Sequence, residues 1–277
     1  GNYENRAKAR TRYMQEVLGD SYVEEFNKKL AEAMQEDLDI AIETRKIIKK
    51  ADKSIIIHPR VTAQKQSGLY AVMYHPIAGT PDVKKFVELV ELVKDMDQVE
   101  FRLTPDEALY IVNCSAVEAQ KIIDATLDSA ANVFETSVAC IGGSICQTGV
   151  RDSQKLLKNL VEESKTWGFD DGVLPKIYVS GCPSSCGTHQ IGRMGFRGGM
   201  KKVNGKPESA FVLFVNGTEG QNNARFGEQI GSILEVEIPN FMKDLGTTIQ
   251  ESGLKFDEWY SENKDEFRKI AAPYVAE

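Results

Sequence analysis

The chain has 277 residues, of which 34 are Lys or Arg and 41 are Asp or Glu, so its formal net charge is −7. This acidic balance gives no reason to expect nucleic acid or an anionic membrane as a partner. With 42% apolar residues, no apolar run long enough to span a bilayer and no secretory signal pattern, the sequence indicates a globular protein of one large or two modest domains.

Three helices are expected before residue 50. Residues 3–18, 21–34 and 37–50 each repeat apolar residues at helical spacing, and Gly19 separates the first two. The first helix is basic, with its cations between residues 6 and 12. Such a run predicts either a solvated face or a face toward an anionic cofactor or a further domain.

Strand and helix patterns alternate over residues 67–138. Thr80 followed by Pro81 predicts a helix start, and Ser115 with Glu118 has the spacing of a capping box. The order β-α-β-β-α-β predicts a ferredoxin-like unit. The expected elements are a strand over 67–75, a helix over 80–96, strands over 99–103 and 109–112, a helix over 115–127 and a strand over 132–138.

The region after residue 150 alternates again and then becomes mostly helical. Residues 192–206 contain five cations, no acid and many glycines, which predicts a loop or a mobile hairpin. The fold class expected is α+β, with N-terminal helices and a ferredoxin-like β-α-β-β-α-β unit followed by an α/β domain. The further elements are a helix over 151–166, strands over 176–179 and 210–215, and helices over most of 226–274, interrupted near Pro239 and Gly253.

Four of the five cysteines occupy two short, glycine-rich stretches. Five residues separate Cys140 from Cys146, and three separate Cys182 from Cys186. Thiolates are soft ligands that suit iron–sulfur clusters, and four of them complete the shell of a [4Fe–4S] cube. Structural zinc favours closer pairs, with about two to four residues between ligands, and nothing indicates a disulfide-bonded secreted protein. Spacing therefore favours a cluster, with a zinc site or unliganded cysteines as alternatives, and Cys114 is expected to be a buried apolar residue.

The sequences VACIGGSIC at 138–146 and KIYVSGCPSSCGTH at 176–189 resemble the signature of siroheme-dependent sulfite and nitrite reductases. The resemblance extends over roughly residues 60–277. It implies that Cys140, Cys146, Cys182 and Cys186 hold a [4Fe–4S] cluster, and that Cys186 also ligates the siroheme iron. Oxygen-labile ligands of this kind suit a reducing cytoplasm.

The resemblance also implies a domain division and further cofactor contacts. Ser184, Ser185 and Gly187 are expected to donate hydrogen bonds to sulfur, and Arg197 in the cationic segment is expected to contact the carboxylates of siroheme. His189 is expected to be a structural histidine, with a proton relay as the alternative. This sequence has Ser184, Arg193 and the pair Asp106-Glu107 where the family often has Asn, an acid and Arg-Gln. The expected domains are a tail of a preceding half over 1–60, a nitrite/sulfite reductase ferredoxin-like half-domain over 61–132, and a siroheme and [4Fe–4S] domain over 133–277.

The function implied is that of the cluster-bearing half of a sulfite or nitrite reductase. Electrons from a donor such as ferredoxin would pass from the cluster to siroheme, for the six-electron reduction of sulfite to sulfide or of nitrite to ammonia. The alternative is a [4Fe–4S] electron-transfer or redox-sensing module without siroheme. Because the cations that bind the oxyanion belong chiefly to the other half in this family, we expect a weakly active chain that pairs with a missing half or self-associates. The rival is a compact reductase completed by dimerisation or by the basic helix at 6–12.

Overall fold

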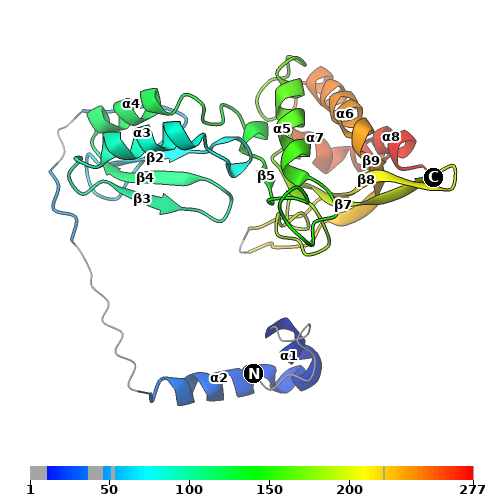
Figure 1. Cartoon of the computed structure of the whole chain (residues 1–277), viewed down its shortest axis with the longest axis horizontal. Coiled ribbons are helices and arrows are strands. Elements are labelled where there is room, and N and C mark those ends of the chain that lie inside the picture. Colours follow the sequence, from blue (N-terminus) through cyan, green and yellow to red (C-terminus); the bar gives the residue numbers. More distant parts are fainter. Residues whose placement is uncertain (1–10, 37–45, 51–53, 221, 277) are drawn as a thin grey trace. The chain divides into compact units, whose positions relative to one another are not determined.

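The computed structural model describes residues 11–36, 46–50, 54–220 and 222–276, and the chain divides into a unit of residues 1–46 and a unit of residues 47–277 (Figure 1). The first unit contains two helices, which confirms the helix predicted over 21–34 and the described part of the one predicted over 3–18. The cations between residues 6 and 10, and residues 37–45, lie outside the described residues. Residues 46–50 are not helical, so the third predicted helix is wrong there. The elements are α1 (Thr11–Leu18), the short 3₁₀ helix η2 (Gly19–Ser21) and α2 (Tyr22–Ala33).

An apolar stripe runs along α2. Val23, Phe26 and Leu30 lie on consecutive turns, and 62%, 48% and 48% of their surfaces are exposed. Residues three and four positions apart share one face of a helix, so the stripe is continuous. Among the described residues of its unit, therefore, none covers this apolar face of α2.

The second unit begins with an antiparallel sheet of four strands in the order β1-β2-β4-β3. Two helices cover one face of this sheet and bury a core around Tyr74, Leu89, Ile111 and Ile122. Cys114 is fully buried in this core, which agrees with its prediction as an apolar residue. The elements are β1 (Val61–Ala63), β2 (Tyr70–Tyr74), the short η3 (Ile77–Gly79), α3 (Val83–Val93), β3 (Glu100–Leu103), β4 (Leu109–Cys114) and α4 (Ala116–Ala125).

The sequence predicted that residues 132–138 would form the last strand of this sheet, and this prediction is wrong. β1 takes that edge instead and pairs antiparallel with β2, with Val61 opposite Val72. Residues 134–136 form a 3₁₀ turn, η4 (Phe134–Thr136), and only Val138 and Ala139 are extended. These two residues join the second sheet, so the ferredoxin-like arrangement is completed by a strand that precedes it in sequence.

The helix starts of this region were predicted with mixed success. The capping box at Ser115 is present, with the Ser115 hydroxyl accepting from the Glu118 N–H and the Glu118 carboxylate accepting from the Ser115 N–H. The cap of α3, however, is Asp82, whose carboxylate accepts from Lys85 N–H at 3.0 Å. The predicted cap, Thr80, lies two residues before it. Aspartate is as good a cap as threonine, so the pattern allowed either.

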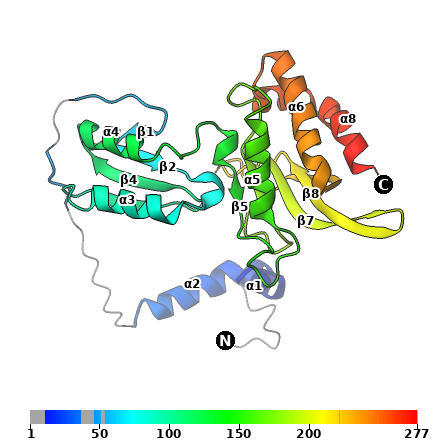
Figure 2. The same ribbon diagram turned by 45° about the horizontal axis from the view of Figure 1, so that its top comes forward.

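The second sheet has five strands in the order β5-β6-β7-β8-β9. Figure 2 labels β5, β7 and β8 of this sheet. The first three strands are parallel, and β7, β8 and β9 are antiparallel. Helices α5, α6, α7 and α8 bury one face of the sheet around Leu157, Phe196, Phe211 and Phe241. The elements are β5 (Val138–Ala139), α5 (Ser153–Ser164), β6 (Ile177–Ser180), β7 (Met194–Val203), β8 (Lys206–Val215), β9 (Glu228–Leu234), the short η5 (Glu235–Glu237), α6 (Ile238–Ser252), α7 (Phe256–Glu262) and α8 (Lys264–Val275).

The cationic segment, predicted as a loop or a hairpin, is a hairpin, and the start of the predicted helical tail is a strand. The cationic segment 192–206 forms β7 and the turn that joins it to β8, with Asn204 and Gly205 both at positive φ. Both left-handed residues match the tight hairpin turns that follow strand twist. Residues 228–234, predicted as helical, pair with β8 as β9. Pro239 lies in the first turn of α6, where proline is tolerated, and Gly253 caps the end of this helix at φ 71°.

The α+β class, with two sheets and preceding helices, is confirmed. In the part of the chain that the structure describes, none of the helices combines the length and apolar character needed to cross a bilayer.

Candidate functional site

The two cysteine stretches leave the second sheet at the carboxyl ends of neighbouring parallel strands. Val138 and Ala139 in β5 align with Tyr178 and Val179 in β6. The Cys140 N–H continues this ladder and donates to the Val179 carbonyl at 3.0 Å. Since parallel strands end at the same edge of a sheet, the pairing brings the two stretches to one place, as the sequence predicted.

All four cysteines of the motif line one cavity of about 70 Å³. Cys182 is buried, Cys140 and Cys146 are half-buried, and Cys186 is exposed. The other lining residues are small or short, and include Gly142, Gly149, Gly181, Thr148 and Ser184.

Glycines allow the two stretches to pack closely. Gly142 has a φ of 74°, and a Cβ there would lie 2.8 Å from the Ser153 nitrogen. A Cβ at Gly187 would lie 2.1 Å from the Val179 carbonyl oxygen. Larger residues at these positions would push the cysteine stretches away from the strands. The stretches are also joined directly, because the N–H of Arg151 donates to the Gly181 carbonyl at 2.9 Å.

The cavity is compatible with a cluster in which each cysteine thiolate binds a different iron atom. In the described residues, no three His, Cys, Asp or Glu side chains converge as ligands of one metal ion would. A four-iron cluster does not need such convergence, because each thiolate ligates its own corner. The four cysteine side chains and the small residues between them are therefore compatible with this group.

Hydrogen-bond donors reach two of the cysteine sulfurs. The Gly181 N–H donates to Cys140 Sγ at 3.1 Å, and Ser153 Oγ lies 3.1 Å from the same sulfur. Cys146 Sγ lies 3.4 Å from Thr148 Oγ1. The Thr148 hydroxyl, followed by the backbone N–H groups of Thr148 and Gly149, lowers the pKa of the Cys146 thiol. Such contacts favour the thiolate form that binds metal.

The predicted donors behave differently. The Ser185 hydroxyl donates to the Pro183 carbonyl at 3.1 Å and accepts from Gln190, so it braces its own turn. The Gly187 N–H donates to Ser180 Oγ at 3.1 Å rather than to sulfur. Ser184 lines the cavity and is exposed. Ser153 and Thr148 were not predicted to contact sulfur. For Thr148, a hydroxyl residue two positions after Cys146 was the available signal in the sequence.

Comparison with known proteins gives this arrangement a context. No family model matches the chain. The ferredoxin–nitrite reductase of Spinacia oleracea is 26% identical over 258 residues, which are 89% of this chain and 41% of that protein. The sulfite reductase (NADPH) hemoprotein beta-component of Staphylococcus haemolyticus is 28% identical over 260 residues, 87% of this chain and 42% of that protein. The chain is therefore similar to ferredoxin–nitrite reductases and to a sulfite reductase hemoprotein component.

A solved structure has the same fold. The structure of the Mycobacterium tuberculosis NirA protein matches 95% of this chain and 50% of its own, with a TM-score of 0.71 and 22% sequence identity. The chain spans less than half the length of the two curated reductases and half of the NirA chain. The resemblance read from the cysteine motifs is thereby confirmed.

The cations of segment 192–206 are spread over β7 and the residues that flank it. Arg197 lies opposite Ser180 of β6, and its guanidinium lies 5.4 Å from the centre of the Phe214 ring. Arg193 pairs with Asp257 at 3.1 Å, and Lys201 donates to the Tyr274 carbonyl at 2.8 Å. Arg197 is thus near the second cysteine stretch, while the other two cations contact the C-terminal helices. A role for Arg197 toward siroheme stays a prediction.

His189 is built into the reductase fold as a structural residue. Its Nδ1 lies 2.9 Å from Ser180 Oγ, and its ring lies 4.8 Å from that of Phe214. Ser180 Oγ accepts the Gly187 N–H, so its proton suits the unprotonated Nδ1 of a neutral imidazole. Burial, followed by the nearby charge of Arg197, lowers the pKa of His189 to about 4.

We expect His189 to make the fold acid-sensitive. Because its folded pKa is below the ordinary value, the unfolded chain binds the proton first. The contribution of His189 to the free energy of unfolding therefore declines as pH drops below about 6.5, and the decline is complete below about pH 4. The expected loss of unfolding free energy is about 3 kcal/mol, and most of this loss occurs between about pH 6.5 and about pH 4.5. Urea unfolding of the wild type and of His189→Asn over this range measures it. The variant should lose less unfolding free energy on acidification. An equal dependence of unfolding free energy on pH in the two proteins would contradict the role given to His189.

Proposed function

We propose that this chain provides the [4Fe–4S] cluster and the cluster side of the siroheme site in a sulfite or nitrite reductase. The observation that supports this most strongly is the meeting of four cysteines in one cavity at the ends of β5 and β6. Cys140, Cys146 and Cys182 would hold the cluster with Cys186. All five cysteines are free thiols, which suits a reducing compartment such as the cytoplasm.

Cys186 is the thiolate best placed to face a second group. It is the exposed member of the four, whereas Cys182 beside it is buried. A shared ligand must be accessible on the side away from the cluster, so this difference supports the bridging role. When bound, the siroheme and cluster pair supplies single electrons to an oxyanion, and six electrons convert sulfite to sulfide or nitrite to ammonia.

The remaining parts of the proposal concern domains and partners. We assign residues 61–132 to a ferredoxin-like half-domain, residues 133–277 to the cofactor domain and residues 1–60 to a tail. The ferredoxin named for the spinach reductase is a candidate electron donor. The other half of the site would come from a separate or preceding segment, or from a second copy of this chain.

Metal analysis tests the cluster directly. After anaerobic reconstitution we expect about four iron and four acid-labile sulfide per chain, with a broad visible absorption. Addition of siroheme should then produce an intense Soret-type band. A cluster without any haem band would favour an electron-transfer or redox-sensing module. One tightly bound zinc with no sulfide would overturn the cluster altogether.

We expect Cys186→Ser to act differently from Cys140→Ser. In the siroheme-loaded chain, loss of Cys186 removes a proposed ligand of both groups, so it should change the haem-band position and the cluster signals together. Cys140→Ser should disturb the cluster and reach the haem only through it. Visible and electron paramagnetic resonance spectra of both variants make the comparison. An unchanged haem band in Cys186→Ser would remove the bridging assignment.

A further inference from the structure

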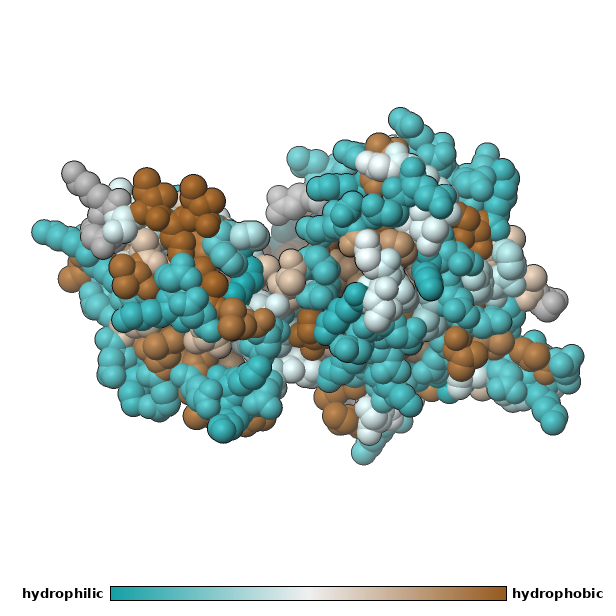
Figure 3. Space-filling view, turned by 90° about the horizontal axis from the view of Figure 1, so that it is seen from above, coloured by the Kyte–Doolittle hydropathy of each residue, from teal (hydrophilic) through white to brown (hydrophobic). Residues whose placement is uncertain are grey.

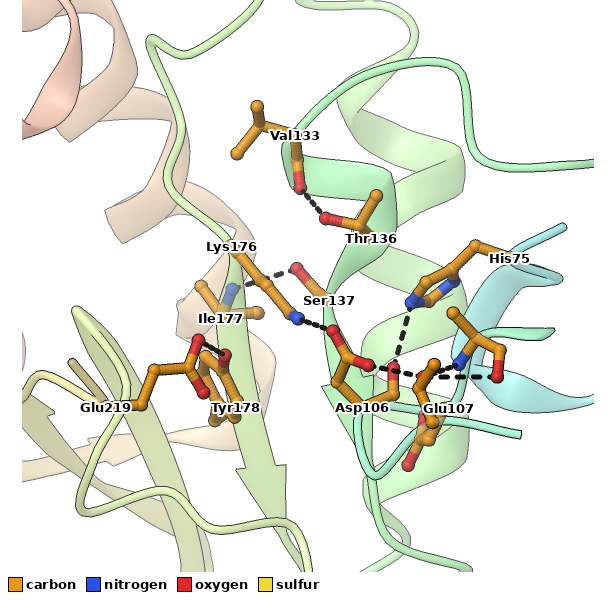
Figure 4. A network of polar contacts seen from close by, with 12 residues as sticks. His75, Asp106, Glu107, Val133, Thr136, Ser137, Lys176, Ile177, Tyr178 and Glu219 are labelled. Atoms are coloured by element: carbon orange, nitrogen blue, oxygen red, sulfur yellow. Dashed lines mark hydrogen bonds and ion pairs between the residues drawn. The ribbon is translucent and has the colours of Figure 1, made fainter. Parts of the chain in front are cut away.

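The turn between β3 and β4 reaches the two strands that carry the cysteine stretches (Figure 4). Thr104 closes this turn, because its N–H donates to the Ala108 carbonyl at 3.0 Å and its hydroxyl oxygen accepts from the Ala108 N–H at 3.2 Å. His75 lies against it, with Nε2 3.1 Å from the Asp106 carbonyl oxygen. Glu107 in the turn has a φ of 66°. A residue with a side chain rarely adopts this conformation, and it persists only where surrounding contacts hold it.

Asp106 in this turn binds the start of β6. Its carboxylate pairs with the Lys176 ammonium at 2.8 Å, and Lys176 directly precedes Ile177, the first residue of β6. Partial burial acts the other way, but hydrogen bonds from Lys176 and then Thr104 lower the pKa of Asp106 to about 2. The carboxylate is therefore ionised and paired at neutral pH.

Glu107, the next residue, binds the end of β5. Its Oε2 accepts the Ala139 N–H at 3.2 Å, and Ala139 immediately precedes the first cysteine. β5 is an edge strand, so the N–H and carbonyl of Ala139 face away from β6. The Gln154 side chain donates to that carbonyl at 2.9 Å. Glu107 and Gln154 together thus hold both polar groups of the residue before Cys140.

The space for Glu107 is provided by a glycine. A Cβ at Gly79 would lie 2.7 Å from the Glu107 Cβ, so only glycine lets the turn come this close. Further along, the Ser137 hydroxyl accepts the Ile177 N–H at 2.9 Å and joins the starts of β5 and β6. Two adjacent acids of one turn therefore contact both strands from which the cysteine stretches leave.

We propose that Glu107 is a positioning residue of the cluster site: its carboxyl group holds the Ala139 N–H and so fixes the direction in which Cys140 leaves β5. The inference rests on the proposed function for its consequence, the retention and electronic state of the cluster. The hydrogen bond itself belongs to the protein and can be tested without metal.

The test compares full-length variants in which the acceptor is withdrawn or kept. Glu107→Ala removes the acceptor, and Glu107→Asp keeps a carboxyl group but shortens the side chain by one methylene. In metal-free protein, both should speed amide hydrogen exchange at Ala139 and Cys140 about tenfold. In the loaded protein, they should speed cluster loss to a chelator about tenfold and change the resonance signal of the reduced cluster. Glu107→Gln, which keeps an oxygen acceptor, should stay within about twofold of wild type in each.

Glu100→Ala is the matched control, because Glu100 is an exposed acid on the same hairpin. It should leave exchange and cluster loss unchanged. Wild-type exchange at Ala139 in Glu107→Asp, or fast exchange in Glu107→Gln, would overturn the proposal. If Glu107→Ala does not fold, the aspartate and glutamine variants decide. If the wild type takes up no cluster, the proposed function fails, while exchange at Ala139 still decides whether Glu107 positions this residue.

Discussion

Serine at Cys140, Cys146 or Cys182 should reduce the sulfide bound per chain to below about a tenth of the wild-type content. Each of these side chains lines the same cavity, and a cube with one corner unligated is open to solvent and to loss of iron. The measurement is iron and acid-labile sulfide after anaerobic reconstitution, with circular dichroism to show that each variant folds.

Cys114→Ser is the matched control. Cys114 is fully buried in the core of the first sheet, where burial raises the pKa of its thiol to about 12, and it is remote in sequence from the two cysteine stretches. The variant should keep the wild-type content of iron and sulfide. Equal loss in Cys114→Ser, or full sulfide content in Cys182→Ser, would exclude the proposed ligand set.

The second prediction concerns the rate at which this chain alone reduces sulfite or nitrite. Produced alone and loaded with cofactors, this chain should reduce sulfite or nitrite at least about a hundredfold more slowly than the reductases it resembles, because loss of one preorganised donor commonly costs that much. Two described arginines near the cysteine stretches are already engaged. Arg151 donates to the Gly199 carbonyl at 2.8 Å, and Arg197 lies over Phe214. Steady-state assays with a chemical electron donor measure the rate.

The alternative is a dimer that completes the pocket. The dependence of turnover on chain concentration distinguishes this dimer from an incomplete single chain. Exposed apolar side chains gather over the helical layer of the first sheet, where Val83, Val87 and Val117 are 77%, 54% and 53% exposed (Figure 3). A surface of this kind promotes association. Turnover per chain that rises with chain concentration, together with dimers in sedimentation, would support this alternative. Rates equal to those of the reductases at every concentration would contradict the incomplete site.

The sequence predicted the elements whose signals are local. The capping box at Ser115, the helix over 153–164 and the strand before Cys182 depend on residues within one or two turns of each other. β7 was missed because its glycines resemble loop signals, although they serve contacts distant in sequence. A Cβ at Gly195 would lie 2.0 Å from the His189 carbonyl oxygen, and one at Gly198 would lie 2.2 Å from that of Gly181.

The sequence also did not predict which sheet the short strands would join. β1 has three residues and β5 has two, too few for an alternation pattern to assign either to a sheet. β9 was missed because Ile233 is its one fully buried residue, so its pattern was weak. In the site, the cysteines could be found from their spacing alone. Ser153 and Glu107 could not, because each reaches its partner through folding rather than through sequence proximity.

The crossover between β5 and β6 has a consequence for the order of assembly. Parallel neighbours cannot be joined by a tight turn, and here α5 makes the connection. Before that connection forms, the two cysteine pairs are separate dithiol sites. Each pair alone can bind a zinc or copper ion but cannot ligate a complete [4Fe–4S] cluster. Closing such a non-local pairing is slow compared with helix formation. For the proposed cluster, we therefore expect higher occupancy when iron and sulfide are supplied after the sheet has folded than when they are present during folding.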